Sequence, residues 1–76
     1  MTSREFEHEM LKAKTFAETG SSYNYWRGYQ RGLRRRFHGE NFGEPGEHEK
    51  WLSLIHDETR RELGRGYRDG YFGPAQ

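Results

Sequence analysis

One short motif occurs twice in this chain, and each copy carries two glycines four residues apart. The sequence contains Arg27-Gly28-Tyr29-x-x-Gly32-Leu33 and, near its other end, Arg65-Gly66-Tyr67-x-x-Gly70-Tyr71. On a helix, this glycine spacing leaves a flat strip on which a second backbone can approach closely. Each glycine inside a helix costs about 0.8–1 kcal/mol relative to alanine, so four of them need a structural reason. We predict that the two copies face each other.

The sequence therefore predicts a glycine-rich seam between two helices, flanked by aromatic and aliphatic side chains. The residues expected in this helix-packing seam are Gly28, Gly32, Gly66, Gly70, Trp26, Tyr29 and Leu33. An alternative is that the glycines admit a phosphate or a base to the tyrosine face. Both copies lie in mid-helix, away from the N-terminal ends that bind anions, and this position favours packing.

Composition predicts a small all-α protein. The chain has 76 residues, only 30% of them hydrophobic, with no valine and a single isoleucine. Strands depend on β-branched residues, so a helical bundle with a thin aromatic core is expected. Cysteine is absent, which removes disulfides and zinc-thiolate sites and favours a cytoplasmic location. No apolar run has the length of a membrane span, so we expect no membrane partner.

Capping signals divide the expected single domain, residues 1–76, into three helices. We predict helices over residues 3–19, 22–38 and 47–71, with a glycine-rich connector at 39–46. Thr2-x-x-Glu5 has the spacing of a capping box, Ser21 or Ser22 can cap the second helix, and Gly39 can end it. A break near residues 56–58, with Asp57 as N-cap, is the alternative for the last helix and would give four helices.

Charge is unevenly distributed along the chain, although the net charge is only +1. Residues 23–38 contain five arginines and no acid, whereas residues 39–63 have a net charge of −4. Arg27, Arg31, Arg34 and Arg35 form a stripe along one face of the second helix. Arginines interleaved with aromatic rings are typical of nucleic-acid binding and also of protein interfaces. A third possibility is neutralisation within the molecule by Asp57, Glu58 and Glu62.

The sequence offers no recognisable catalytic or metal-binding constellation. The histidines are His8, His38, His48 and His56, and no two of them have the i, i+4 spacing of a helical metal site. A Walker-type phosphate loop is absent. We therefore expect no enzyme activity, no catalytic residue, no metal and no cofactor.

At the doubled motif the sequence resembles the ribosome modulation factor family, small bacterial proteins of two helices joined by a linker. Gly28-Tyr29-x-x-Gly32 is similar to the motif on the family's first helix, while Trp51 and Gly66-Tyr67 are similar to the cluster on its second. The resemblance implies binding to RNA or the ribosome. This chain differs from the family in its additional N-terminal helix and its acidic second half.

The small size and the acidic half also resemble, by type, the accessory inhibitors of phages, anti-CRISPR proteins among them. We therefore expect a non-enzymatic inhibitor that docks on a host nucleic-acid-binding protein or ribonucleoprotein complex, with segment 40–62 mimicking phosphates. Direct RNA or ribosome binding is the alternative, and a homodimer is possible. The partner-binding residues expected are Arg27, Arg31, Arg34, Arg35, Tyr25, Glu44, Glu47 and Glu49.

Overall fold

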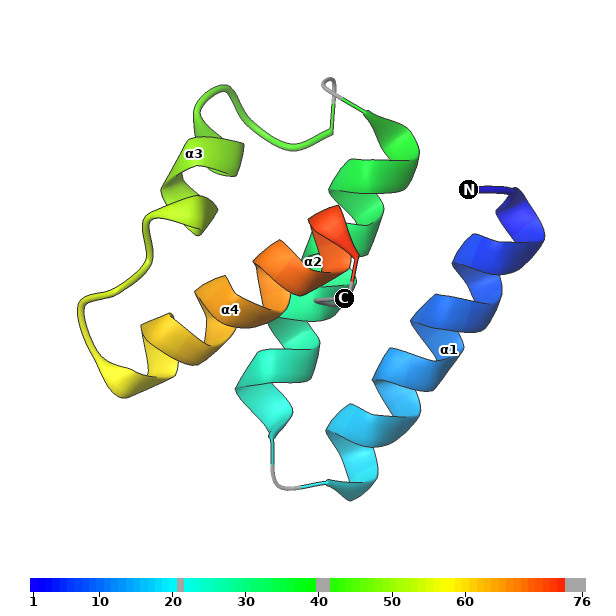
Figure 1. The fold of residues 1–76 in the computed structure, drawn as a ribbon, viewed down its shortest axis with the longest axis horizontal. Coiled ribbons are helices and arrows are strands. Elements are labelled where there is room, and N and C mark those ends of the chain that lie inside the picture. Colours follow the sequence, from blue (N-terminus) through cyan, green and yellow to red (C-terminus); the bar gives the residue numbers. More distant parts are fainter. Residues whose placement is uncertain (21, 40–41, 74–76) are drawn as a thin grey trace.

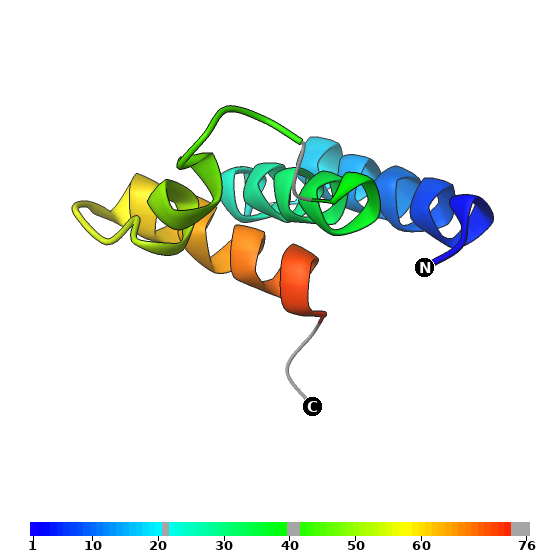
Figure 2. The same ribbon diagram turned by 90° about the horizontal axis from the view of Figure 1, so that it is seen from above.

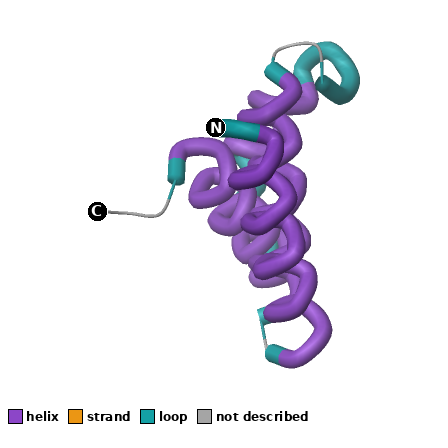
Figure 3. Tube along the Cα trace, turned by 90° about the vertical axis from the view of Figure 1, so that its right-hand side faces the viewer, coloured by secondary structure: helices purple, strands orange, loops and turns teal. Residues whose placement is uncertain are grey.

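Four α-helices form in the part of the chain that the computed structural model describes, residues 1–20, 22–39 and 42–73. They are α1 (Ser3–Thr19), α2 (Tyr23–His38), α3 (Glu47–Leu52) and α4 (Glu58–Phe72), as Figure 1 shows. No strand occurs in these residues, which are all helix or loop (Figure 3). The predicted all-α class is therefore confirmed.

The first two helices begin and end close to where the sequence predicts them. Thr2 Oγ1 accepts a hydrogen bond from the Glu5 amide at 3.1 Å, and the Glu5 carboxylate accepts one from the Thr2 amide at 3.2 Å. Ser22 occupies the N-cap position of α2 but makes no side-chain capping bond, and Ser21 lies outside the described residues. The chain leaves α2 at Gly39, which has a φ of 86°.

The single helix predicted over residues 47–71 is wrong. Helix α3 ends at Leu52, and α4 begins after Asp57, whose carboxylate accepts a hydrogen bond from the Arg60 amide at 2.7 Å. The break near 56–58, considered as the alternative, is what forms. The cap stabilises a new helix start, and the break leaves Ile55 61% exposed rather than on a continuous apolar face.

Helices α1 and α2 run antiparallel in one layer, and α4 crosses α2 on one side of that layer (Figures 1 and 2). Helix α3 packs on α4, and its Trp51 ring stacks on Tyr67 with the ring centroids 5.3 Å apart. The most extensive contact between any two helices is the one between α2 and α4.

At this crossing, the glycines of both motif copies lie against backbone atoms of the opposite helix. A Cβ on Gly28 would come within 2.9 Å of the Leu63 carbonyl carbon, and one on Gly32 within 2.8 Å of the Tyr71 amide nitrogen. From the other side, a Cβ on Gly66 would come within 2.8 Å of the Tyr25 carbonyl carbon. A Cβ on Gly70 would come within 3.0 Å of the Tyr29 carbonyl carbon. Side chains at these positions would hold the two helices apart.

The hydrophobic core is thin and largely aromatic. The buried hydrophobic side chains of the described residues are those of Ala13, Tyr29, Leu33 and Tyr67. Two of the ring pairs between α1 and α2 are stacked: Phe6 lies on Phe37 with centroids 4.3 Å apart, and Phe16 lies on Trp26 at 4.9 Å. Because the small chain buries so few large side chains, these ring contacts carry much of the packing.

Candidate binding groove

A groove opens between α2, the connector, α3 and the start of α4. It consists of two adjoining hollows of about 670 and 300 Å³ that share Arg31, Glu47 and Trp51. We refer to it as the basic groove. Its charged lining residues are Arg27, Arg31, Arg34, Lys50, Arg60, Glu44 and Glu47, and its larger apolar ones are Trp51, Leu54 and Leu63.

Positive charge dominates this groove. Five cationic side chains line it against two carboxylates, and three chain segments supply them. Arg27 and Arg34 are exposed on α2, and the Arg27 guanidinium lies 5.7 Å from the centre of the Tyr23 ring. Clefts lined by charges of one sign concentrate ligands of the opposite sign, so this surface is suited to an anionic partner.

An ion pair in the groove joins Arg31 to Glu47. Arg31 Nε donates to Glu47 Oε1 at 2.7 Å, and Arg31 Nη2 donates to the same oxygen. The other carboxylate oxygen accepts a hydrogen bond from the Glu44 amide at 2.9 Å. This backbone bond is the largest cause of the lowered pKa of Glu47, followed by the contact with Arg31. The Arg31 guanidinium also lies over the Phe42 ring, 4.5 Å from its centre.

The predicted arginine stripe is therefore divided between two surfaces. Arg27, Arg31 and Arg34 line the basic groove, whereas Arg35 Nη1 donates to the Phe42 carbonyl oxygen at 3.2 Å. Arg35 lines a separate hollow of about 370 Å³ together with Glu49. Residues 43–46 line both this hollow and the basic groove, so the stripe is continuous on the helix but reaches two different hollows on the folded protein.

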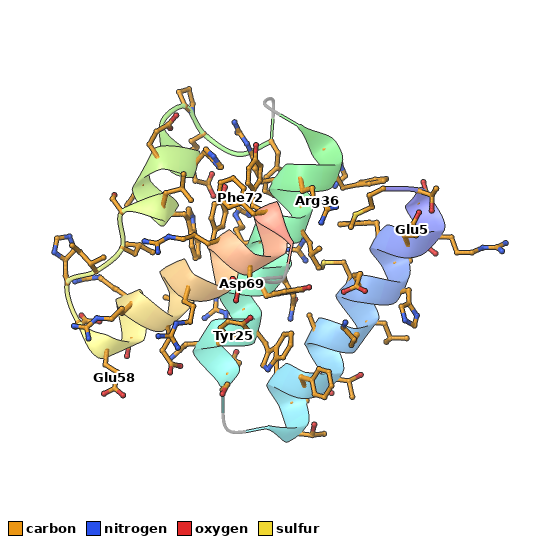
Figure 4. All side chains as sticks on the ribbon, viewed as in Figure 1. Glu5, Tyr25, Arg36, Glu58, Asp69 and Phe72 are labelled. Atoms are coloured by element: carbon orange, nitrogen blue, oxygen red, sulfur yellow. The ribbon has the colours of Figure 1, made fainter. Side chains whose placement is uncertain are left out.

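Tyr25 lies away from the groove, at the crossing of α2 and α4. Its hydroxyl donates to Asp69 Oδ2 at 2.5 Å, and Figure 4 shows the two side chains next to each other. Burial, and then this hydrogen bond, raise the pKa of Tyr25 well above its usual value. The residue predicted to contact a partner thus joins two helices of its own chain.

The neutralisation of the arginine stripe by acids of the same chain also differs from the arrangement considered from the sequence. Asp57 caps α4 and pairs with Arg60 at 3.4 Å, and Glu58 lies at the outer end of α4 (Figure 4). Among the described residues, Glu47 from α3 pairs with Arg31 of the stripe. The break between α3 and α4 changes which acids can reach α2.

Several groove residues were not predicted from the sequence: Lys50, Trp51, Leu54, Arg60 and Leu63. They come from α3, the loop after it and α4, and only the folded chain brings them beside α2. A local signal existed for Trp51 alone, as one of two tryptophans in a chain with a small apolar content.

The described residues contain no group of three or more histidine, aspartate or glutamate side chains that could hold a metal ion. His48 instead shares a hydrogen bond of 2.7 Å between its Nδ1 atom and the Tyr67 hydroxyl. Within the same ranges, no helix has the length and apolar character needed to cross a membrane.

Comparisons of the chain with protein-family models, curated proteins and solved structures find no match. The basic groove must therefore be interpreted from its own chemistry.

Proposed function

We propose that the protein is a non-enzymatic RNA-binding protein whose basic groove takes the phosphate backbone of a single-stranded segment. The observation that carries this proposal is the convergence of five cationic side chains beside a half-buried indole, Trp51. Guanidinium and ammonium groups neutralise phosphates, and aromatic rings in such grooves stack on unpaired bases. The resemblance to the ribosome modulation factor family implies the same class of ligand.

Two acids of the 39–63 segment support RNA binding over phosphate mimicry. A phosphate mimic must present its acidic groups to basic residues of another protein. Glu47 contacts Arg31 and the Glu44 amide, and Asp57 caps its own helix. These two acids of the 39–63 segment are therefore engaged inside the molecule.

Docking on a host protein or ribonucleoprotein complex, as a phage anti-CRISPR-like inhibitor would do, is the second candidate. Glu44 and Glu49 favour it, because both are exposed and line the hollow beside Arg35. For either function we propose a cytoplasmic location.

We further propose that the four motif glycines serve as a helix-packing seam rather than as part of a binding surface. The proposal is supported by the close approach of the opposite helix's backbone at all four glycines, each of which is buried. The proposal does not include a homodimer through these strips, because the opposite helix of the same chain already covers them.

The RNA proposal can be tested with a double variant, Arg27→Gln with Arg34→Gln. Both side chains are exposed on α2, so the fold should persist. Affinity for a mixed-sequence single-stranded RNA oligonucleotide would be measured by fluorescence anisotropy at several salt concentrations. The parent should lose affinity steeply with salt, and the variant's slope in log Kd against log salt should fall by about 0.7 for each lost phosphate contact.

The matched control is Arg61→Gln with Arg65→Gln, which removes the same charge from exposed positions on α4 outside the groove. It should keep most of the parent's affinity. An equal loss of RNA affinity in both double variants would show that binding depends only on net charge. That result would contradict binding in the basic groove. A parent protein that does not bind RNA even at low salt would contradict the proposal itself and leave protein docking as the better candidate.

A further inference from the structure

The Glu47 carboxylate lies in a site built from hydrogen-bond donors. Arg31 donates to one oxygen from both Nε and Nη2, and the Glu44 amide donates to the other oxygen. Trp51, one helical turn further along α3, lines the same hollows, and its side chain helps to lower the pKa of the Glu47 carboxyl. The side chain of Glu47 is only 19% exposed, and that of Arg31 is 32% exposed.

The connector is shaped around this carboxylate. Gly43 has a φ of 81°, in the region that favours glycine. A Cβ on Gly43 would lie 2.9 Å from Glu47 Cδ. The backbone therefore passes directly over the anion, and the Glu44 amide is directed at it.

These donors are also the ones that recognise phosphate. An arginine guanidinium offers two parallel N–H groups to carboxylates and phosphates alike. Backbone amides and an indole N–H add further donors without bringing a negative charge. Once the Glu47 side chain rotates away, Arg31, Glu44 N and Trp51 would offer an empty anion site on the wall of the basic groove.

We propose that this is a binding site for one phosphate group of the RNA, and that Glu47 occupies it as an internal competitor until RNA displaces it. This inference rests on the proposed RNA binding and adds a mechanism to it. Glu47 lowers the affinity of the free protein and prevents small anions from filling the site. A phosphate held by neighbouring contacts to Arg27 and Arg34 has the high local concentration needed to replace the carboxylate.

The central test is Glu47→Gln, which keeps the size and one acceptor of the side chain but removes its charge. Its affinity for the single-stranded RNA oligonucleotide should rise by about fivefold, the upper end of the range for surface salt bridges, because this pair is partly buried. The slope of log Kd against log salt should steepen by about 0.7, for one more phosphate contact. Adding Arg31→Gln to this variant should remove both gains.

The matched control is Glu49→Gln, which removes the same charge two residues further along α3, where the side chain is exposed. If the parent binds RNA in a salt-dependent manner but Glu47→Gln and Glu49→Gln have equal affinities, the role of Glu47 as an internal competitor is refuted and the proposed function stands. A parent without salt-dependent RNA binding would overturn both.

NMR provides a second measurement, first in the parent protein and then in the variant. In the parent protein, the NMR signals of Arg31 Nε–H and the Trp51 indole N–H should shift on addition of the RNA, because Arg31 exchanges a carboxylate for a phosphate and Trp51 lines the same hollow. In Glu47→Gln, inorganic phosphate alone should shift the same two signals in a saturable manner. If RNA binds and neither signal moves, the phosphate site is refuted even if the Glu47 variant does not fold.

Discussion

Replacing Gly66 by alanine tests the packing of α2 against α4. Alanine is the better helix former by about 0.8–1 kcal/mol, so on an exposed face this substitution would stabilise the protein. At the helix crossing, the new methyl group would come within 2.8 Å of the Tyr25 carbonyl carbon and 2.9 Å of the Tyr29 amide nitrogen. Both are backbone atoms, and the carbonyl oxygen of Tyr25 is closer still. No side-chain rotation can relieve the overlap, so the helices must move apart.

The expected effect follows from two opposing free energies. Overpacking in a close-packed contact costs about 1–3 kcal/mol and occasionally more, and rigid backbone on the opposite side places Gly66→Ala at the upper end. After the gain in helix propensity is subtracted, the free energy of unfolding should fall by about 2 kcal/mol. In a domain of this size, such a loss lowers Tm by about 10 °C.

Thermal unfolding followed by far-ultraviolet circular dichroism would measure the effect. Thr59→Ala is the control, because Thr59 is exposed on the same helix and its replacement should change stability by no more than about 0.5 kcal/mol. Gly66→Leu should destabilise the protein more than Gly66→Ala, since it brings more atoms into the same contact. A Tm for Gly66→Ala equal to or above that of the parent would refute the close approach of the two helices.

Two further predictions concern the contacts that position α4. Tyr25→Phe should lower the free energy of unfolding by about 1–2 kcal/mol, because Asp69 loses its hydrogen-bond donor. Because the pKa of Tyr25 is raised above its unfolded-state value of about 10, the protonated hydroxyl stabilises the fold below that pH, and this contribution is lost as the pH rises above it. Urea unfolding below and above that pH should therefore show a smaller fall in the free energy of unfolding for Tyr25→Phe than for the parent. Asp57→Ala should cost about 1 kcal/mol by removing the cap of α4, whereas Asp57→Asn should retain most of the stability; equal chemical stability of the two variants would contradict the capping role.

The candidate site was predictable only in part. Arg27, Arg31 and Arg34 could be placed on one face of a helix from their spacing, and all three line the basic groove. Periodicity does not show which part of a helix face another segment covers, so Arg35 could not be separated from them. The contact between Arg31 and Glu47 joins residues 16 positions apart, and its formation depends on where the connector turns.

By itself, the sequence determined the helical class and the ends of the first two helices. The capping box of Thr2 with Glu5 and the glycine after each helix act within a few residues, so their effect can be read from the chain. The Asp57 cap also acts locally, so the break near 56–58 could be considered from the sequence, although only the structure decided between one helix and two. Only the tertiary structure decided that Tyr25 bonds to Asp69 44 positions away and that Trp51 lies beside the arginines. The physical reason is that capping depends on neighbours along the chain, whereas these contacts depend on the angle at which α4 crosses α2.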